Sequence, residues 1–93
     1  MSVVRINEFR AFLGSGDTLR NRIRSFVPLI ESSDGCVSCQ LLQSQEDPTR
    51  ILVIEVWESV ERHRASLKNI PPVTFQETMK LLASPPKGEY FNI

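Results

Sequence analysis

The stretch Asp47–His63, DPTRILVIEVWESVERH, contains a polar turn, an apolar strand that ends in tryptophan, and the start of a helix. Between Ile51 and Val56 only Glu55 interrupts the apolar residues. Such a run is typical of a strand with both faces covered, whereas a strand with one face in water alternates apolar and polar residues. A chain of 93 residues has too few helices to cover both faces of a sheet. We therefore expect another surface to cover one of them.

Length and charge limit the classes of protein to consider. The 93 residues are enough for one domain, spanning 1–93. Eleven basic residues balance eleven acidic ones, so no net charge attracts nucleic acid or an anionic membrane surface. No apolar run approaches the roughly 20 residues that cross a bilayer, and the N-terminal residues do not resemble a signal peptide. We expect a cytoplasmic protein with neither nucleic acid nor membrane as a partner.

The two cysteines, Cys36 and Cys39, form a CxxC sequence within a predicted strand. Residues three apart in a regular strand point to opposite faces, so we expect two separate, buried or half-buried thiols and no dithiol site. With one histidine and no further cysteine, the chain also lacks the ligands for a zinc site. We predict no metal.

The remaining sequence predicts an alternation of strands and helices. Val3 to Phe12 reads as a strand that is apolar on both faces, and Asp17 or Ser15 begins an amphipathic helix that ends near residues 32–35. Strands at 35–45 and 50–58 are joined by a hairpin loop at 46–49. Ser59 caps a second helix, Pro71-Pro72 starts a third, and residues 87–93 supply a last strand.

This order of elements predicts an α+β, ferredoxin-like fold, the split βαβ arrangement with one antiparallel sheet. Both helical connections then lie on one face of the sheet and leave the opposite face bare. A bare apolar sheet face is larger than soluble monomers usually expose. We therefore predict a homodimer whose sheets pack face to face.

Several short motifs resemble one family in their order and spacing. They are NEFRA at 7–11, a glycine and Asp17 before the first helix, EDPTR at 46–50, EVWES at 55–59, and the aromatic last strand. Together they resemble the antibiotic biosynthesis monooxygenase family, in particular its quinol monooxygenases. The resemblance implies a dimeric α/β barrel of two ferredoxin-like subunits. It also implies a monooxygenase that oxidises a small quinol or aromatic phenolic compound with molecular oxygen and without a cofactor.

The resemblance further implies a pocket between the sheet and the helices of each subunit. His63, on the inward face of its helix with Val60 and Leu67, is the candidate catalytic base, since a neutral imidazole can take a proton from a phenol. Asn7 is the second catalytic candidate, suited to orienting oxygen or a substrate hydroxyl. The candidate substrate-binding residues are Trp57, Phe9, Leu67, Phe75, Met79 and Tyr90. Haem-degrading relatives carry an iron-ligating histidine near 75–80, where this chain has none.

Each of these residues also has a purely structural interpretation. His63 can be a hydrogen-bonded core residue, Trp57 can serve core packing, and Asn7 can satisfy backbone groups. Glu55 must be paired, protonated or facing a polar cavity, and we favour an ion pair at the dimer interface, for which Arg5 is a possible partner, over an acid catalyst. Two other functions stay open, a non-catalytic dimer that binds a small aromatic ligand and an isomerase or cyclase of the same barrel type. Consumption of oxygen distinguishes the monooxygenase from both.

Overall fold

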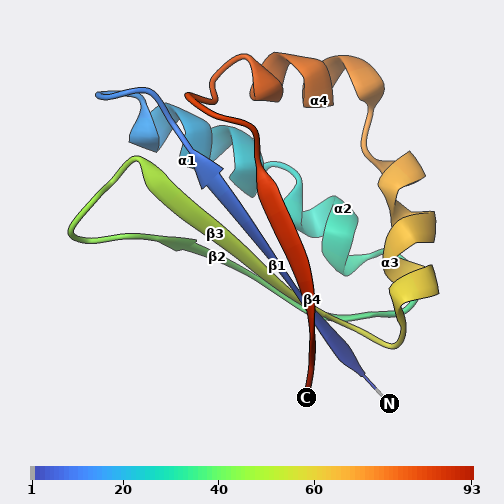
Figure 1. Ribbon diagram of the computed structural model, residues 1–93. Helices are drawn as coiled ribbons and strands as arrows, with labels where there is room; N and C mark the ends of the chain where they lie inside the picture. The colour runs from blue at the N-terminus through green and yellow to red at the C-terminus, as the bar shows by residue number, and fades with distance from the viewer. Residues whose placement is uncertain (1) are drawn as a thin grey trace.

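A four-stranded antiparallel sheet with strand order β2-β3-β1-β4 forms one layer of the computed structural model, which describes residues 2–93. The helices form a second layer on one side of this sheet (Figure 1). The elements are β1 Val3–Arg10, α1 Gly16–Arg24, α2 Val27–Glu31, β2 Cys36–Gln43, β3 Arg50–Trp57, α3 Val60–Ser66, the 3₁₀ helix η1 Leu67–Asn69, α4 Pro72–Met79 and β4 Lys87–Asn92. The predicted α+β, ferredoxin-like fold is confirmed.

The first helical segment differs from its prediction, because it is divided into α1 and α2. The division falls at Ser25 and Phe26, just before Pro28 in the first turn of α2. A proline has no backbone N–H and its ring clashes with the preceding turn, so an uninterrupted helix is unfavourable here. The apolar periodicity continues through the break, and Leu19, Ile23 and Phe26 are all buried.

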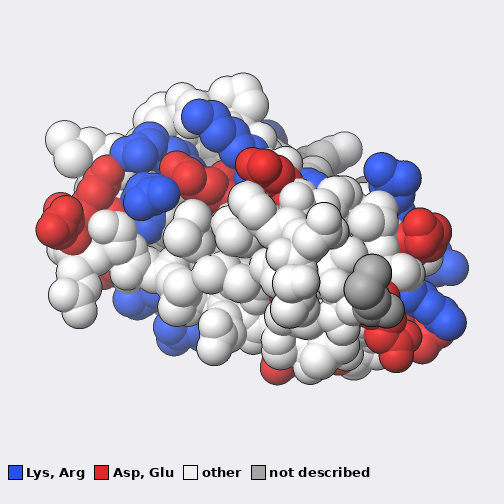
Figure 2. Space-filling view, turned by 60° about the horizontal axis from the view of Figure 1, so that its bottom comes forward, with Lys and Arg blue, Asp and Glu red and all other residues white. Residues whose placement is uncertain are grey.

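The central strand β3 separates the two faces of the sheet. Its buried residues Ile51, Val53, Glu55 and Trp57 face the helices, and Leu52, Ile54 and Val56 face the other way. In the register with β1, Val4 and Ile6 lie opposite Val56 and Ile54 and share that open face. Figure 2 shows a broad surface without charged side chains on this side, with charged groups around its margin. The sheet therefore has an apolar open face, as the sequence predicted.

The side of the sheet that faces the helices forms the core. The core cluster comprises Ala11, Leu19, Ile23, Ile51 and Val53, which join α1 to β3 and to the residue that follows β1. Gly16, at the start of α1, is buried against the backbone of Pro48 in the β2–β3 hairpin, where a Cβ atom would collide with the Pro48 carbonyl group. This close approach fixes α1 across one end of the sheet.

A β-bulge in β2 overturns one expectation about the cysteines. Cys36 lies opposite Trp57 and Cys39 opposite Glu55, with Val37 as the extra residue. The inserted residue reverses the alternation, so both cysteines face the helices and the prediction of opposite faces is wrong. Both thiols are free and half-buried, as expected. Burial raises the pKa of both, that of Cys39 to about 12, so they remain protonated at neutral pH.

None of the helices within residues 2–93 is both long and apolar enough to cross a membrane. The longest, α1, has nine residues.

Candidate functional site

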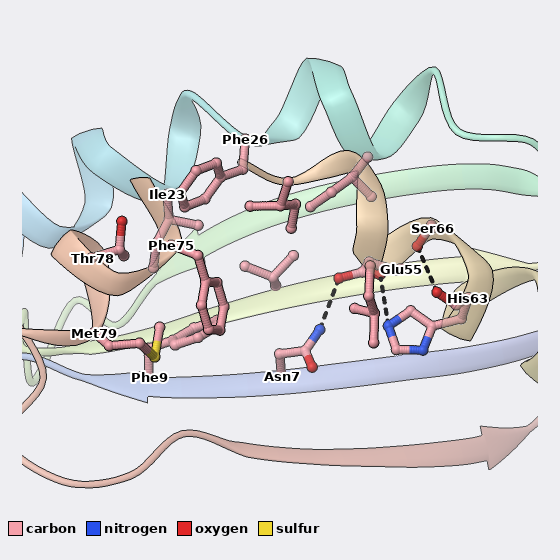
Figure 3. A pocket seen from close by; sticks show the side chains of 14 residues that line it. Asn7, Phe9, Ile23, Phe26, Glu55, His63, Ser66, Phe75, Thr78 and Met79 are labelled. Carbon is pink, nitrogen blue, oxygen red and sulfur yellow. Dashed lines mark hydrogen bonds and ion pairs between the residues drawn. The ribbon is translucent and has the colours of Figure 1, made fainter. Parts of the chain in front are cut away.

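A cavity of about 120 Å³ lies between the sheet and the helices. Most of its wall is apolar and comes from both layers of the fold, with aromatic and aliphatic side chains that include Phe9, Ile23, Phe26, Val53, Leu67, Phe75 and Met79. Asn7, Glu55, His63 and Ser66 bring polar groups to the same cavity. Figure 3 shows these polar residues together at one end. The cavity thus combines a largely apolar space with a concentrated set of titratable and hydrogen-bonding groups.

Glu55 is the buried carboxylate of this site, with 4% of its surface exposed. Its Oε1 accepts a hydrogen bond from Trp57 Nε1 and its Oε2 accepts one from Asn7 Nδ2, both at 2.8 Å. Burial raises the pKa of Glu55, while these two hydrogen bonds and the charge of Arg5 act in the opposite direction. Because both oxygens accept hydrogen bonds, the surroundings fit the carboxylate form.

The interpretation of Glu55 as part of an interface ion pair is wrong. The register of β3 turns Glu55 to the helices and the cavity, away from the open face of the sheet. Arg5 lies opposite Glu55 on β1, but its Nε donates to Asn7 Oδ1 at 3.0 Å and its guanidinium group lies 4.6 Å from the centre of the Tyr90 ring. Arg5 therefore acts on Glu55 through its charge and through Asn7.

His63 is held beside Glu55 by α3. Ser59 caps this helix by accepting a hydrogen bond from the Arg62 backbone N–H, and His63 follows on the face turned to the sheet, with 6% of its surface exposed. Its Nε2 lies 3.8 Å from Glu55 Oε1. Its Nδ1 lies 2.6 Å from the Tyr90 hydroxyl oxygen.

The surroundings of His63 keep its imidazole neutral. The ring packs edge-on between Trp57 and Tyr90, with ring centres 5.5 and 5.4 Å away. Burial, followed by the charges of Arg5 and Arg64, lowers the pKa of His63 to about 4. At neutral pH the ring therefore has one unprotonated nitrogen that can take up a proton, with a carboxylate nearby to stabilise the resulting cation.

Asn7 has a fixed orientation in this network. Its Oδ1 accepts from Arg5 and its Nδ2 donates to Glu55, so the amide cannot reverse without losing both hydrogen bonds. Gly88 on β4 lies opposite Asn7 and leaves room for the Arg5 guanidinium group, which a Cβ atom at this position would touch. Arg5, Asn7, Glu55 and Trp57 thus form one continuous chain of hydrogen bonds.

The structure brings most of the residues predicted for the site together. Six of the eight candidates line the cavity: Asn7, Phe9, His63, Leu67, Phe75 and Met79. The other two, Trp57 and Tyr90, lie behind the polar end, where Trp57 donates to Glu55 and Tyr90 bonds His63. These two contact the polar residues but are not among the residues that line the cavity.

For Glu55 the polar cavity was one of the alternatives that the sequence left open, but the dimer interface was favoured, and the structure places the residue in the cavity. A signal was present, because Glu55 lies two residues before Trp57 and therefore shares its face of the strand. A single charge on the face that carries a buried tryptophan indicates a polar site within the core. Among residues 2–93, no group of three or more histidine, cysteine, aspartate and glutamate side chains is placed to hold a metal ion.

Comparisons with known proteins agree with this fold. A candidate antibiotic biosynthesis monooxygenase from Nitrosomonas europaea is 21% identical with a TM-score of 0.86, and the match covers 97% of this chain and 96% of that one. Rv0793 from Mycobacterium tuberculosis is 18% identical with a TM-score of 0.84, over 100% and 95% of the two chains. A single-residue mutant of SnoaB, a cofactor-independent oxygenase from Streptomyces nogalater, is 19% identical with a TM-score of 0.77, over 99% and 92%.

Family membership follows from the sequence itself. No curated protein matches the chain significantly. The sequence model of the antibiotic biosynthesis monooxygenases, however, matches residues 2–80, which include every element from β1 to α4. The chain therefore belongs to the antibiotic biosynthesis monooxygenase family.

Proposed function

We propose that this protein is a cofactor-independent monooxygenase that oxidises a small quinol or aromatic phenolic compound with molecular oxygen. The observation that carries the proposal is a buried, neutral His63 beside the buried carboxylate of Glu55, at the end of an apolar cavity. Family membership supports it, and one structural relative, SnoaB, is itself a cofactor-independent oxygenase.

The reaction needs a substrate anion, because a phenolate passes an electron to oxygen far more readily than the neutral phenol does. His63 takes the proton of the substrate hydroxyl, and Glu55, 3.8 Å away, stabilises the imidazolium that forms. The proposed reactive tautomer has its proton on Nδ1, which donates to the Tyr90 hydroxyl oxygen, and in this tautomer Nε2 is the atom that receives the substrate proton. The apolar walls keep water away from the anion and the oxygen.

The overall reaction balances without an external reductant. For a phenol with a free ring position, one atom of oxygen becomes a new ring carbonyl and the other leaves as water. The substrate supplies all four electrons and ends as a quinone. No residue of the protein has to change its oxidation state. The proposed role of the chain is therefore to bind the substrate, to deprotonate its hydroxyl group and to exclude water.

The proposed assembly is a homodimer formed through the open face of the sheet. At the centre of this face lie Val4, Ile6, Leu52, Ile54 and Val56, which the helices of the same chain do not cover. An ion pair between Arg50 and Glu8, at 3.2 Å, lies at one end of the face and contributes to its charged margin. A second copy of the same face offers a matching apolar centre and charged margin.

The test is oxygen uptake by metal-free protein with a panel of quinols and phenols, run beside His63→Gln and the surface control Thr18→Ala. The proposal predicts uptake that falls at least about a hundredfold in His63→Gln and is unchanged in Thr18→Ala. Substrate conversion without oxygen would instead establish an isomerase or cyclase. Binding without any conversion would establish a ligand-binding protein.

A further inference from the structure

The cavity is polar at one end and apolar at the other. Asn7, Glu55 and His63 lie at the end formed by β1, β3 and α3, whereas Phe9, Phe75 and Met79 lie toward the other end (Figure 3). Thr78 is the one polar residue near those apolar side chains, and its hydroxyl donates to the Thr74 carbonyl of its own helix at 2.8 Å. The Thr78 oxygen can still accept a hydrogen bond, but with 1% of the residue exposed it offers little surface to a ligand, so the accessible hydrogen-bonding groups lie mainly at the other end.

At the polar end, one atom is available for a ligand hydroxyl. His63 Nε2 lies 3.8 Å from Glu55, beyond hydrogen-bond distance, and within residues 2–93 the only hydrogen bond of the ring is made by Nδ1. In the tautomer whose Nδ1–H donates to Tyr90, a substrate hydroxyl that donates to Nε2 satisfies this nitrogen and is positioned for proton transfer. The oxygens of Glu55 are adjacent and can accept from a second hydroxyl on the neighbouring ring carbon.

The size of the cavity limits the ligand to one aromatic ring. Its volume of about 120 Å³ compares with the roughly 150 Å³ of an engineered apolar cavity that binds benzene. Leu67 and Phe75 are 56% and 44% exposed although both line the cavity, so they form its mouth. A short apolar substituent on the ring can extend between these two side chains.

We propose that the site selects single-ring phenols and catechols with an apolar substituent opposite the hydroxyl, and rejects para-quinols. A ring held with one hydroxyl on His63 directs its para position toward Phe9, Phe75 and Met79. A second hydroxyl there loses its hydration without gaining a partner, whereas a methyl group of similar size is buried favourably. For turnover, this inference rests on the proposed function, whereas the binding preference can be tested without turnover.

The test compares 4-methylphenol with hydroquinone, because the two differ only by a methyl group in place of a hydroxyl. Binding is measured by calorimetry without oxygen, so no product forms. We expect 4-methylphenol to bind about ten- to hundredfold more tightly than hydroquinone, and 4-methylcatechol to bind at least as well as 4-methylphenol. Equal or tighter binding of hydroquinone, or no binding of any of the three, overturns the inference.

A variant tests the cause of the preference. Met79→Gln places an amide of similar size at the apolar end and should bring the two affinities within about threefold of each other, whereas Thr18→Ala should leave the wild-type ratio intact. An unchanged ratio in folded Met79→Gln overturns the assignment of the apolar end. If the ratio is as expected but no phenol supports oxygen uptake, the selectivity stands and the oxygenase proposal fails. If 4-methylphenol and hydroquinone support equal oxygen uptake, the oxygenase proposal stands and the selectivity fails.

Discussion

The Nδ1 atom of His63 lies 2.6 Å from the hydroxyl oxygen of Tyr90, although 27 residues separate them in the chain. This contact joins α3 to β4, the edge strand that contributes Tyr90 to the helix-facing side of the sheet. Tyr90 is itself covered by the Arg5 guanidinium group. The orientation of the candidate base therefore depends on the last strand of the fold.

Removing the Tyr90 hydroxyl should impair the base without preventing binding. In Tyr90→Phe the imidazole loses the bond that fixes its ring, so we expect kcat to fall about tenfold with little change in KM or in the anaerobic affinity for 4-methylphenol. The free energy of unfolding should fall by only about 1 kcal/mol. Oxygen uptake and calorimetry measure these effects. An unchanged kcat would show that this bond does not position the base.

The pKa of His63 can be measured directly, because it is the one histidine of the chain. We expect its ring proton signals in NMR spectra to titrate with a midpoint of about 4, below the usual 6.5. Arg5→Gln should raise this pKa because it removes a positive charge, and Arg5→Lys, which keeps the charge, should raise it less. A midpoint near 6.5 in the folded wild-type protein would contradict the neutral, buried imidazole.

The same shift predicts how stability depends on pH. The folded pKa of His63 lies below its unfolded value, so folding favours the neutral ring. The contribution of this preference to the free energy of unfolding is complete above about pH 6.5 and is lost as the pH falls toward 4. Its upper bound is roughly 3 kcal/mol. Urea unfolding of wild type and His63→Gln measures it. The difference between their free energies of unfolding should shrink from pH 7.5 to pH 5, and a constant difference would contradict the linkage.

The fold could be predicted from local sequence to a large extent. The apolar run before Trp57, the hairpin loop at 46–49 and the Ser59 cap each depend on residues within a few positions, so they indicated the order of strands and helices. The bulge at Val37 could not be predicted in the same way. The bulge arises from the pairing of β2 with β3, which residues close in sequence do not reveal. The CxxC spacing alone favours a regular strand with the two cysteines on opposite faces.

The site was less predictable because its key contacts are long-range. Helical periodicity turned His63 inward, but nothing near it in sequence indicated Tyr90 as its partner. Strand alternation placed Glu55 on the same face as Trp57, yet alternation does not say which face meets the helices. That choice depends on the packing of the whole sheet, and it moved Glu55 from an expected interface to the cavity.

A charge at the centre of the open sheet face should dissociate the proposed dimer. Ile54 lies in the middle strand on that face, so Ile54→Lys places an ammonium group where two apolar faces meet. We expect sedimentation equilibrium to give the mass of a dimer for wild type and of a folded monomer for Ile54→Lys. Leu13→Lys changes a 96% exposed leucine in the turn after β1 and is the matched control. A monomeric wild type, or a dimeric Ile54→Lys, would contradict this assembly.

Variants of Glu55 test whether its buried carboxylate supports activity through its charge or through its hydrogen bonds. In Glu55→Gln one oxygen can still accept from Trp57, but the new amide N–H₂ meets the Asn7 N–H₂, which Arg5 holds in place. One buried donor is then unsatisfied, at a cost of roughly 1–3 kcal/mol in unfolding free energy. We expect oxygen uptake to fall at least about tenfold as well, because the imidazolium loses its counter-charge.

The double variant Asn7→Asp with Glu55→Gln separates the two effects. The aspartate introduced on β1 can accept from both Arg5 and the glutamine introduced on β3, so every hydrogen bond of the chain and its net charge are restored, with the carboxylate moved from β3 to β1. Urea unfolding should therefore show recovered stability, while oxygen uptake should stay low because the charge is no longer the one beside His63 Nε2. Recovery of activity together with stability would mean that Glu55 serves only to keep the buried network satisfied.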